Sequence, residues 1–382
     1  MARPAMRAWL LAPAGLAMLA GLDAGLLLAG LSAPVSGDRL REIHGVLMVL
    51  GFLATLISLE RAVALRRHWG YVAPALLGAG GVALLTPAPL LLGQLLLVDG
   101  TIAMLVLYVA LWRRQRDDPT SVQLLAVVMA CCAAMLWVRV DVAAVLPWLT
   151  GFIVLTIAAE RVELARLSLP ATAGPTLISL AGCFVGAAMV ALVEPRDGPG
   201  WGARGVGLLL LVIVAWLARN DVARRTIAAA GLPRFSGAAM LAGYGWLAVA
   251  GATWLVGGVP ASQRGYDTVI HAVFLGFAVS MVFAHAPVIL PAVLHRPLPY
   301  RRGLWAPLVL LHLGLLIRIG AGNGAGHQGA WQVGSALNVA AMLLFVIVAV
   351  AVTVRASASA TATEPTGGTR RTVTRAATRE RS

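Results

Sequence analysis

Lysine is absent from this sequence, cysteine occurs only three times, and charged residues make up only 12% of its 382 positions. Charged residues are about 25% of an ordinary soluble domain, so this composition excludes that class of protein. Cys131, Cys132 and Cys183 all lie inside apolar runs, and adjacent cysteines on a helix point to different faces. We therefore interpret the cysteines as small packing residues and expect no disulfide framework.

Apolar residues dominate instead, at 59% of the chain with a mean hydropathy of +0.85. Because the bilayer core is about 30 Å thick and a helix rises about 1.5 Å per residue, each crossing needs roughly 20 mostly apolar residues. Twelve such runs predict an all-α integral membrane protein with about twelve transmembrane helices. The runs are 9–31, 43–65, 71–88, 89–112, 120–138, 141–165, 174–193, 203–219, 235–258, 267–294, 304–320 and 330–354.

Arginine supplies all 30 of the Lys and Arg residues, so the positive-inside rule can be tested on arginine alone. The test supports dividing 71–88 from 89–112 at Thr86-Pro87-Ala88-Pro89, where proline either kinks or ends a helix. With that division, most arginines fall on one side of the membrane. This predicts a bacterial inner-membrane protein with both termini in the cytoplasm. The opposite side receives only Arg39, Arg41, Arg139, Arg196, Arg204, Arg264 and Arg318.

The net charge of +14 does not indicate nucleic-acid binding, because the arginines are spread over loops and the C-terminal tail. Residues 1–355 are predicted to form the polytopic membrane domain, with the lipid bilayer as its partner. Residues 356–382 are rich in Thr, Ala and Arg without a hydrophobic period. They are predicted to form a basic, disordered cytoplasmic tail that contacts anionic headgroups.

An internal repeat occurs at an offset of one hundred residues. Segments 51–61 and 151–161 share Gly-Phe, one Ile and Glu-Arg, and a fainter third copy begins at Gly276, with His285 in the position of the glutamates. Parallel repeats predict three groups of four helices around a common interior. Convergent composition of membrane helices is the alternative. The repeat-related helices are 43–65, 141–165 and 267–294.

Histidines inside the membrane are the main functional signal, because neutral imidazole binds heme iron or copper without bringing a charge into lipid. His44 opens the second predicted helix and His271 opens the tenth, both near the outer surface. We predict that they share one site. Met48 and Met281 follow them and are candidate thioether ligands for copper, although methionine in a membrane core more often serves packing.

His285 lies fourteen residues after His271, roughly 21 Å along a helix, so it belongs to a second site or a structural bond. His312, in the eleventh helix, is the other secondary candidate. The alternative for each histidine is a hydrogen bond to a neighbouring helix. Asp23 and Asp99 lie in apolar runs, where they either pass protons or pair with a partner. Glu60-Arg61 and Glu160-Arg161 are expected to pair locally at helix ends.

The segment from His271 to Met281 contains His-x4-Gly-x4-Met and resembles the NnrS family. Members of that family are twelve-helix membrane proteins of denitrifying and nitric-oxide-responsive bacteria, described as containing heme and copper. The likeness covers mainly 267–320 and extends more loosely to 41–60. It implies heme and copper as cofactors.

A more distant resemblance is to the catalytic subunit of heme-copper oxidases, through the twelve helices, the three groups of four and the His44-Gly-x-x-Met48 pattern. In that family the histidines of helices 2 and 10 hold a low-spin heme, and His44 and His271 correspond to them by position. The sequence departs from that family because helix 6 has no histidine, helix 7 lacks the adjacent histidine pair for copper, and helix 10 lacks the closely spaced pair. Oxygen reduction with proton pumping is therefore not expected.

Three functional hypotheses remain open. The first is a protein that binds heme and/or copper through His44, His271, His285 and His312, related to nitric oxide or denitrification metabolism. The second is a transporter for a small solute or metal ion, in which Pro287 and Pro291 break the tenth helix. The third is a scaffold or assembly partner of a respiratory or denitrification complex.

Overall fold

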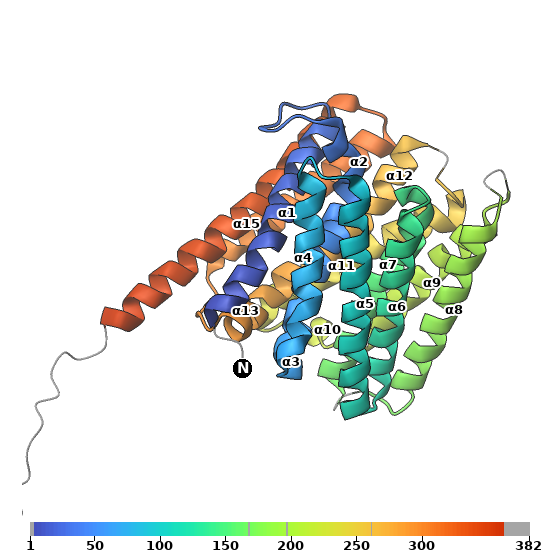
Figure 1. Ribbon diagram of the computed structural model, residues 1–382. Coiled ribbons are helices and arrows are strands. Elements are labelled where there is room, and N and C mark those ends of the chain that lie inside the picture. The colour runs from blue at the N-terminus through green and yellow to red at the C-terminus, as the bar shows by residue number, and fades with distance from the viewer. Residues whose placement is uncertain (1–3, 167–168, 196–197, 261, 363–382) are drawn as a thin grey trace, which may run out of the picture.

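A computed structural model describes residues 4–166, 169–195, 198–260 and 262–362, and within them the secondary structure is helical with no strand (Figure 1). Twelve helical stretches in this part of the chain are long and apolar enough to cross a membrane. The elements in chain order are α1 (Pro4–Leu28), α2 (Asp38–Val46), η1 (Leu47–Ala54), α3 (Thr55–Leu65), η2 (His68–Tyr71), α4 (Val72–Leu85), α5 (Leu90–Gln115), α6 (Asp118–Trp137), α7 (Val142–Ala165), α8 (Ala173–Val193), α9 (Trp201–Asn220), α10 (Ala223–Thr226), α11 (Leu232–Gly257), α12 (Gln263–Ile270), η3 (His271–Val279), α13 (Ser280–Leu294), η4 (Arg302–Leu304), α14 (Trp305–Leu315), η5 (Leu316–Gly324) and α15 (Gln328–Ala362).

The all-α membrane fold predicted from hydropathy is confirmed, and each of the twelve predicted runs coincides with one spanning helix. The segment Thr86–Pro89 does separate two helices, since α4 ends at Leu85 and α5 begins at Leu90. The tenth span is not broken by its prolines, because α13 continues through Pro287 and Pro291 to Leu294. α15 extends to Ala362, into the segment predicted as a tail, and residues 363–382 lie outside the described residues.

Three spans contain a stretch of wider π-helix, in which backbone bonds reach five residues back. η1 and η3 occupy equivalent positions of the repeat, around Gly51 and Gly276, and η5 follows His312. All three lie on the helices that carry intramembrane histidines. π-Helical segments are rare and often occur at functional sites, so these three helices are candidates for a functional region.

When the twelve spans are grouped by fours as the repeat predicts, the contacts between the groups close into a ring. α5 of the first group packs on α6 of the second, α9 of the second packs on α11 of the third, and α13 and α15 of the third pack on α1. The repeat-related spans lie inside this ring, where α3 contacts α13 and α7 contacts η3. α7 is the most buried of the twelve spans, and the span from α2 to α3 is second.

The glycine shared by the three repeat copies marks a close approach between helices in each group. A Cβ on Gly51 would meet the backbone of Gly81 in α4, and a Cβ on Gly151 would overlap Met129 in α6. On Gly276 it would lie 2.5 Å from Cβ of Trp246 in α11. Small residues let membrane helices approach at short distance, so the repeated glycine has a packing role in all three groups.

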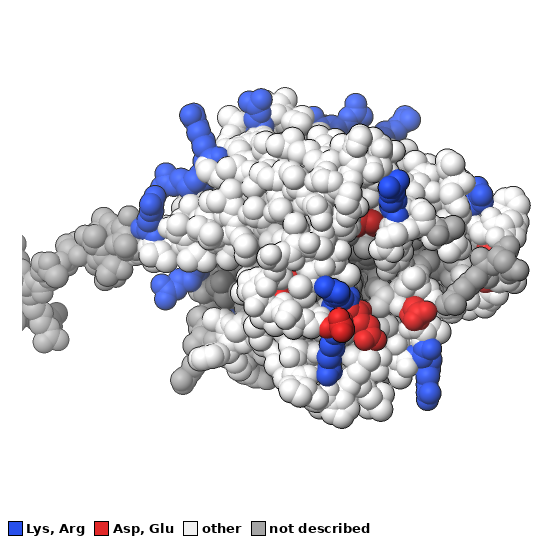
Figure 2. Space-filling model, turned by 90° about the horizontal axis from the view of Figure 1, so that it is seen from above, with Lys and Arg blue, Asp and Glu red and all other residues white. Residues whose placement is uncertain are grey.

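Seen from the end that carries the α1–α2 connection, acidic side chains gather beside arginines, and further arginines protrude around the rim (Figure 2). Inside the molecule, several arginines serve as structural partners instead of loop charges. Arg7, Arg161 and Arg318 are buried, with at most 7% of each residue exposed, and each makes specific hydrogen bonds. The arginine pattern used to orient the chain is therefore partly a pattern of internal ion pairs.

Candidate functional site

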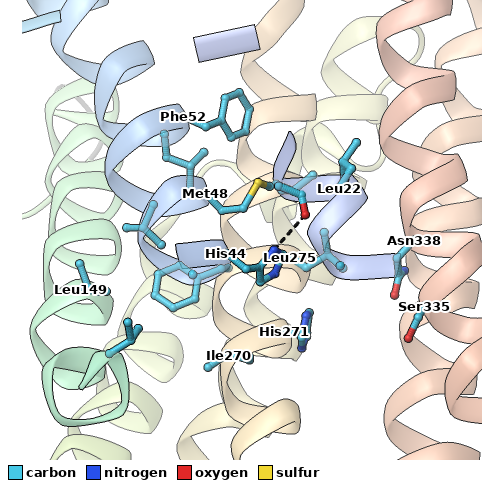
Figure 3. A pocket seen from close by; sticks show the side chains of 18 of the residues that line it. Leu22, His44, Met48, Phe52, Leu149, Ile270, His271, Leu275, Ser335 and Asn338 are labelled. Carbon is cyan, nitrogen blue, oxygen red and sulfur yellow. Dashed lines mark hydrogen bonds between the residues drawn. The ribbon is translucent and has the colours of Figure 1, made fainter. Parts of the chain in front are cut away.

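A narrow pocket of about 100 Å³ lies where α1, η1, α7, η3 and α15 meet, and both His44 and His271 line it (Figure 3). Its wall is otherwise largely apolar, with Phe52 and Phe274 among its members. Twenty-two residues surround this small volume. The two imidazoles reach this pocket, called the slot below, from helices more than two hundred positions apart in sequence.

His44 is held in the pocket by the backbone of α1. Its Nδ1 lies 2.9 Å from the carbonyl oxygen of Gly21, which fixes the ring orientation. Gly25, one turn further on, has no side chain, and a Cβ there would meet Cε1 of the imidazole at 3.6 Å. No described residue forms a hydrogen bond with His44 Nε2. A donated Nδ1–H leaves the lone pair of Nε2 available, which is the usual state of a metal-ligating histidine.

His271 is oriented in the same way, by the turn that precedes it. Its Nδ1 lies 2.9 Å from the carbonyl oxygen of Asp267 and 3.2 Å from the carboxylate of the same residue. Its Nε2 has no hydrogen-bond partner among the described residues. Both rings thus have their Nδ1 engaged by backbone carbonyl oxygen and their Nε2 unengaged, and both line the slot (Figure 3).

Asp267 is a site residue that the sequence reasoning missed. Its carboxylate, with 4% of the residue exposed, accepts hydrogen bonds from Arg318 Nε at 3.1 Å, Asn323 Nδ2 at 2.7 Å and Trp331 Nε1 at 3.1 Å. Arg318 also lines the pocket. The available signal was an acidic residue four positions before His271, one helical turn away, inside an otherwise apolar span.

The two methionines predicted as ligands are separated. Met48 lines the pocket together with the two histidines and packs against Gly21, where a Cβ would overlap its sulfur. Met281 lines a different cavity. The geometry therefore brings together His44, His271 and Met48, and it leaves Met281 outside this set.

His285 also lines that second cavity, apart from the histidine pair. Its Nε2 lies 3.1 Å from Nη1 of Arg161, which is a donor. Because the guanidinium engages the lone pair of Nε2, that nitrogen is not directed at a metal. Phe52 and Leu53 line both cavities and separate them.

His312 is held by α11 and not by the pocket. Trp246 Nε1 donates to its Nδ1 at 3.0 Å, which places the ring proton on Nε2. That Nε2 is buried and has no hydrogen-bond partner in the described part of the chain. His312 therefore makes the hydrogen bond to a neighbouring helix that was the alternative to a ligand role.

The two acids noted in the sequence have different surroundings. One carboxylate oxygen of Asp23 accepts the backbone N–H of Val35 at 3.3 Å, and the other is buried without a partner in the described residues. Asp99 is exposed on the outer surface of α5. Neither lines the pocket with His44 and His271.

Within the described residues no cluster of three or more His, Cys, Asp and Glu side chains is placed to hold a metal ion. The site offers instead two imidazole nitrogens and one thioether in a largely apolar slot with one arginine on its wall. Such a donor set suits a group that brings its own equatorial ligands, or a soft cation that accepts low coordination.

Comparison with known proteins identifies a family for the whole membrane domain. Residues 7–354 match the family described as domain of unknown function (DUF8744). The chain belongs to the DUF8744 family. The match covers all twelve spans except the first residue of the first and the last three of the twelfth, so the DUF8744 unit includes the histidine pocket. No curated protein and no solved structure matches the chain.

Proposed function

We propose that this protein binds heme between His44 and His271 and serves in one-electron transfer within a bacterial membrane. One observation carries the proposal: two imidazoles from distant helices line one narrow slot, each with Nδ1 fixed to a carbonyl oxygen and Nε2 left without a partner. Neutral imidazole with its second nitrogen hydrogen-bonded is the common form of an iron-ligating histidine. Heme held by His44 and His271 would supply a reversible one-electron couple.

The residues in the walls of the slot suit the same group in chemistry, and the pocket of about 100 Å³ would have to widen around it. Phe52, Phe274 and the surrounding aliphatic side chains exclude water, as a macrocycle with apolar faces requires. Arg318 on the wall offers a guanidinium to an anionic substituent, and Asp267 holds that guanidinium in place. Asp267 also contacts the imidazole of His271, so one carboxylate positions both the ligand and the arginine.

Copper is the second candidate, and Met48 is the observation that favours it. Its thioether lines the pocket beside the two imidazoles, which gives the two-nitrogen, one-sulfur donor set suited to Cu(I). The resemblance of 267–320 to the NnrS family supports either metal. That resemblance also supports nitric oxide or denitrification metabolism as the physiological setting.

The proposal includes the inner membrane as the location, with both termini in the cytoplasm. An even number of spans returns the chain to the side on which it began, and most arginines lie on that side. This orientation places His44 and His271 in the outer half of the membrane.

The test is an absorption spectrum of the full-length protein, purified in detergent after expression with a heme precursor and copper. We expect a Soret band, low-spin bands on reduction and a pyridine hemochrome stoichiometric with the chain. His44→Ala and His271→Ala should each abolish them. His312→Ala is the matched control, because it removes an intramembrane histidine outside the pocket and should retain the spectrum.

Elemental analysis separates the two metals. Copper without heme, lost in His44→Ala and in Met48→Leu, would replace the heme proposal with the copper one. A well-folded protein with neither metal would overturn both. Uptake of a solute into proteoliposomes would then support a transporter, and copurification with a respiratory complex would support a scaffold.

A further inference from the structure

The second cavity is larger than the histidine pocket, with a volume of about 440 Å³. It lies between α1, α3, α7, α13 and α15, and its walls are almost entirely aliphatic and aromatic. α15 diverges from α1 toward its C-terminal end (Figure 1), and Val346, Val350 and Val354 on that part of α15 are both exposed and lining. Ligand pockets typically measure about 300–1,000 Å³, so this cavity has the size for a small amphiphile entering from the bilayer.

Three polar side chains at equivalent positions of the repeat line this cavity: Glu60, Glu160 and His285. Two of them are engaged by the arginine of the preceding copy. Arg61 contacts Glu160 at 2.6 Å, and Arg161 contacts His285 at 3.1 Å. By the same order, an arginine of the third copy would contact Glu60. The third copy has Ala286 at the position of Arg61 and Arg161, so this contact is missing.

Glu60 therefore lacks the partner that the other two positions have. Its nearest charged neighbour in the described chain is Arg61 at 3.7 Å, beyond hydrogen-bond distance, and Arg61 is closer to Glu160. The side chain is 29% exposed, although its position is inside the bundle, because it faces the cavity. A carboxylate facing an apolar cavity without a hydrogen-bond donor is costly, so a ligand that donates to it is stabilised.

The charges around Glu60 define the head of that ligand. Arg61 has three carboxylates within 4 Å, those of Glu60, Glu160 and Glu163, so the part of the cavity around Glu60 disfavours an anionic head. Arg296 also lines the cavity, beyond the end of α13 at Leu294, and the phosphatidylglycerol probe below tests whether an anionic head binds there instead. A cationic head would lie beside the guanidinium of Arg61. A neutral hydroxyl donor satisfies Glu60 without either repulsion.

We propose that this cavity binds a neutral amphiphile with phenolic hydroxyl donors, a prenylated hydroquinone, whose head donates to Glu60 and whose tail lies between α1 and α15. The site differs from the histidine pocket, and the binding does not require heme or copper. The quinone form of the same ring has carbonyl acceptors in place of the hydroxyl donors. Glu60 therefore distinguishes the two oxidation states, and the reduced form binds more tightly.

The experiment measures binding of a hydroquinone with a ten-carbon alkyl tail to the full-length protein in nanodiscs under argon, by equilibrium dialysis. The quinone form, a ten-carbon alkylamine and phosphatidylglycerol are the other probes. We expect the hydroquinone to bind about 10- to 100-fold more tightly than the quinone, the range for a hydrogen bond to a charged group. Glu60→Gln should reduce that ratio toward unity.

Ala349→Trp fills the cavity from α15 and should weaken hydroquinone binding at least about tenfold. Its matched control is Leu343→Trp, also on α15 but exposed and absent from the lining, and it should bind like the wild type. Equal binding of hydroquinone and quinone, preference for the amine or the phospholipid, or equal effects of the two tryptophans would each overturn the proposal. These results stand whether or not the protein contains metal.

Discussion

Arg61 and Glu160 form an ion pair of 2.6 Å between the Glu-Arg positions of two repeat copies, although they are 99 residues apart in sequence. The sequence had indicated pairing within each helix end. Arg161 repeats the relationship one copy further on, where it contacts His285. The repeats are therefore linked to one another through charged groups at one end, whereas the repeat glycines make their contacts within each group.

Breaking this link should destabilise the bundle. Arg61→Gln leaves Glu160, whose side chain is 16% exposed, and two more carboxylates without their cation, and we expect a loss of about 3–5 kcal/mol in unfolding free energy. Glu160→Gln should cost less, because Glu60 and Glu163 still neutralise Arg61. Chemical denaturation in detergent measures both. Arg41→Gln breaks an exposed pair with Asp38 and should change stability by less than about 0.5 kcal/mol.

Asp267 should act as a positioning residue for His271. Asp267→Asn keeps the shape but removes the charge that orients the imidazole and holds Arg318, so we expect about 10- to 100-fold weaker heme retention. A shift in heme midpoint potential, measured by redox titration, would accompany it. Asp99→Asn on the exposed surface of α5 is the control. Unchanged affinity and potential in Asp267→Asn would show that the carboxylate has no influence on the ligand.

Asp221, which directly follows α9, should make the fold sensitive to acid. Burial raises the pKa of Asp221, but the hydrogen bonds from Arg161, Tyr244 and the Ala223 amide lower it by more than burial raises it. The pKa of Asp221 is therefore below its ordinary value of 3.8. A carboxyl group whose pKa is lower in the folded than in the unfolded state stabilises the fold at pH values above the unfolded-state pKa. That stabilisation is lost as the pH falls through the folded-state pKa. Melting temperature should therefore fall below about pH 4.

Asp221→Asn should lower the melting temperature at pH 7 and weaken its dependence on pH in acid, as followed by thermal unfolding in detergent from neutral to acidic buffer. Asp38→Asn, at an exposed site, should leave the wild-type profile intact. The same acid profile in Asp221→Asn and the wild type would assign the acid sensitivity to other groups.

The repeat glycine gives a packing prediction. In Gly276→Ala the new methyl group would overlap Trp246, which also holds His312, so we expect a loss of about 1–3 kcal/mol from overpacking. Gly245→Ala, in α11 beside Trp246, meets nothing within 4 Å and should be neutral or stabilising. Thermal unfolding of the two variants in parallel provides the comparison, and equal melting temperatures would contradict it.

Topology can be tested with reporters that are active on one side of the membrane. A fluorescent protein fused to the C-terminus should fold, because we expect that end in the cytoplasm. A periplasm-dependent phosphatase inserted in the connection between α1 and α2 should be active. The reverse pattern would place the histidine pair in the cytoplasmic half of the membrane.

The number of spans and their approximate positions were predictable because hydropathy acts locally. Each crossing must be about 20 residues long and apolar regardless of its neighbours, so the run of residues is enough to identify it. The π-helical segments η1, η3 and η5 were not predicted, since a single extra residue in a helical turn leaves no trace in composition.

The candidate functional residues were also predictable only in part. His44 and His271 were identified because imidazole in lipid is unusual and both open their helices near the outer surface, and His312 was kept as a secondary candidate. The sequence did not show which of these rings is already engaged by a neighbouring helix. Their separation depends on Trp246, which engages His312, and on Gly21 and Asp267, which engage the other two.

By itself the sequence determined an all-helical, twelve-span membrane protein and drew attention to its histidines, methionines and repeats, because a bilayer imposes length and polarity on each segment separately. Only the tertiary structure decided which of those side chains meet. His44, His271 and Met48 line one pocket, and His285 and Met281 line another. Arg318 also lines the first pocket, where it is bound by Asp267. Such meetings depend on helix rotation and interhelical distance, which are set by many contacts at once and have no local signature.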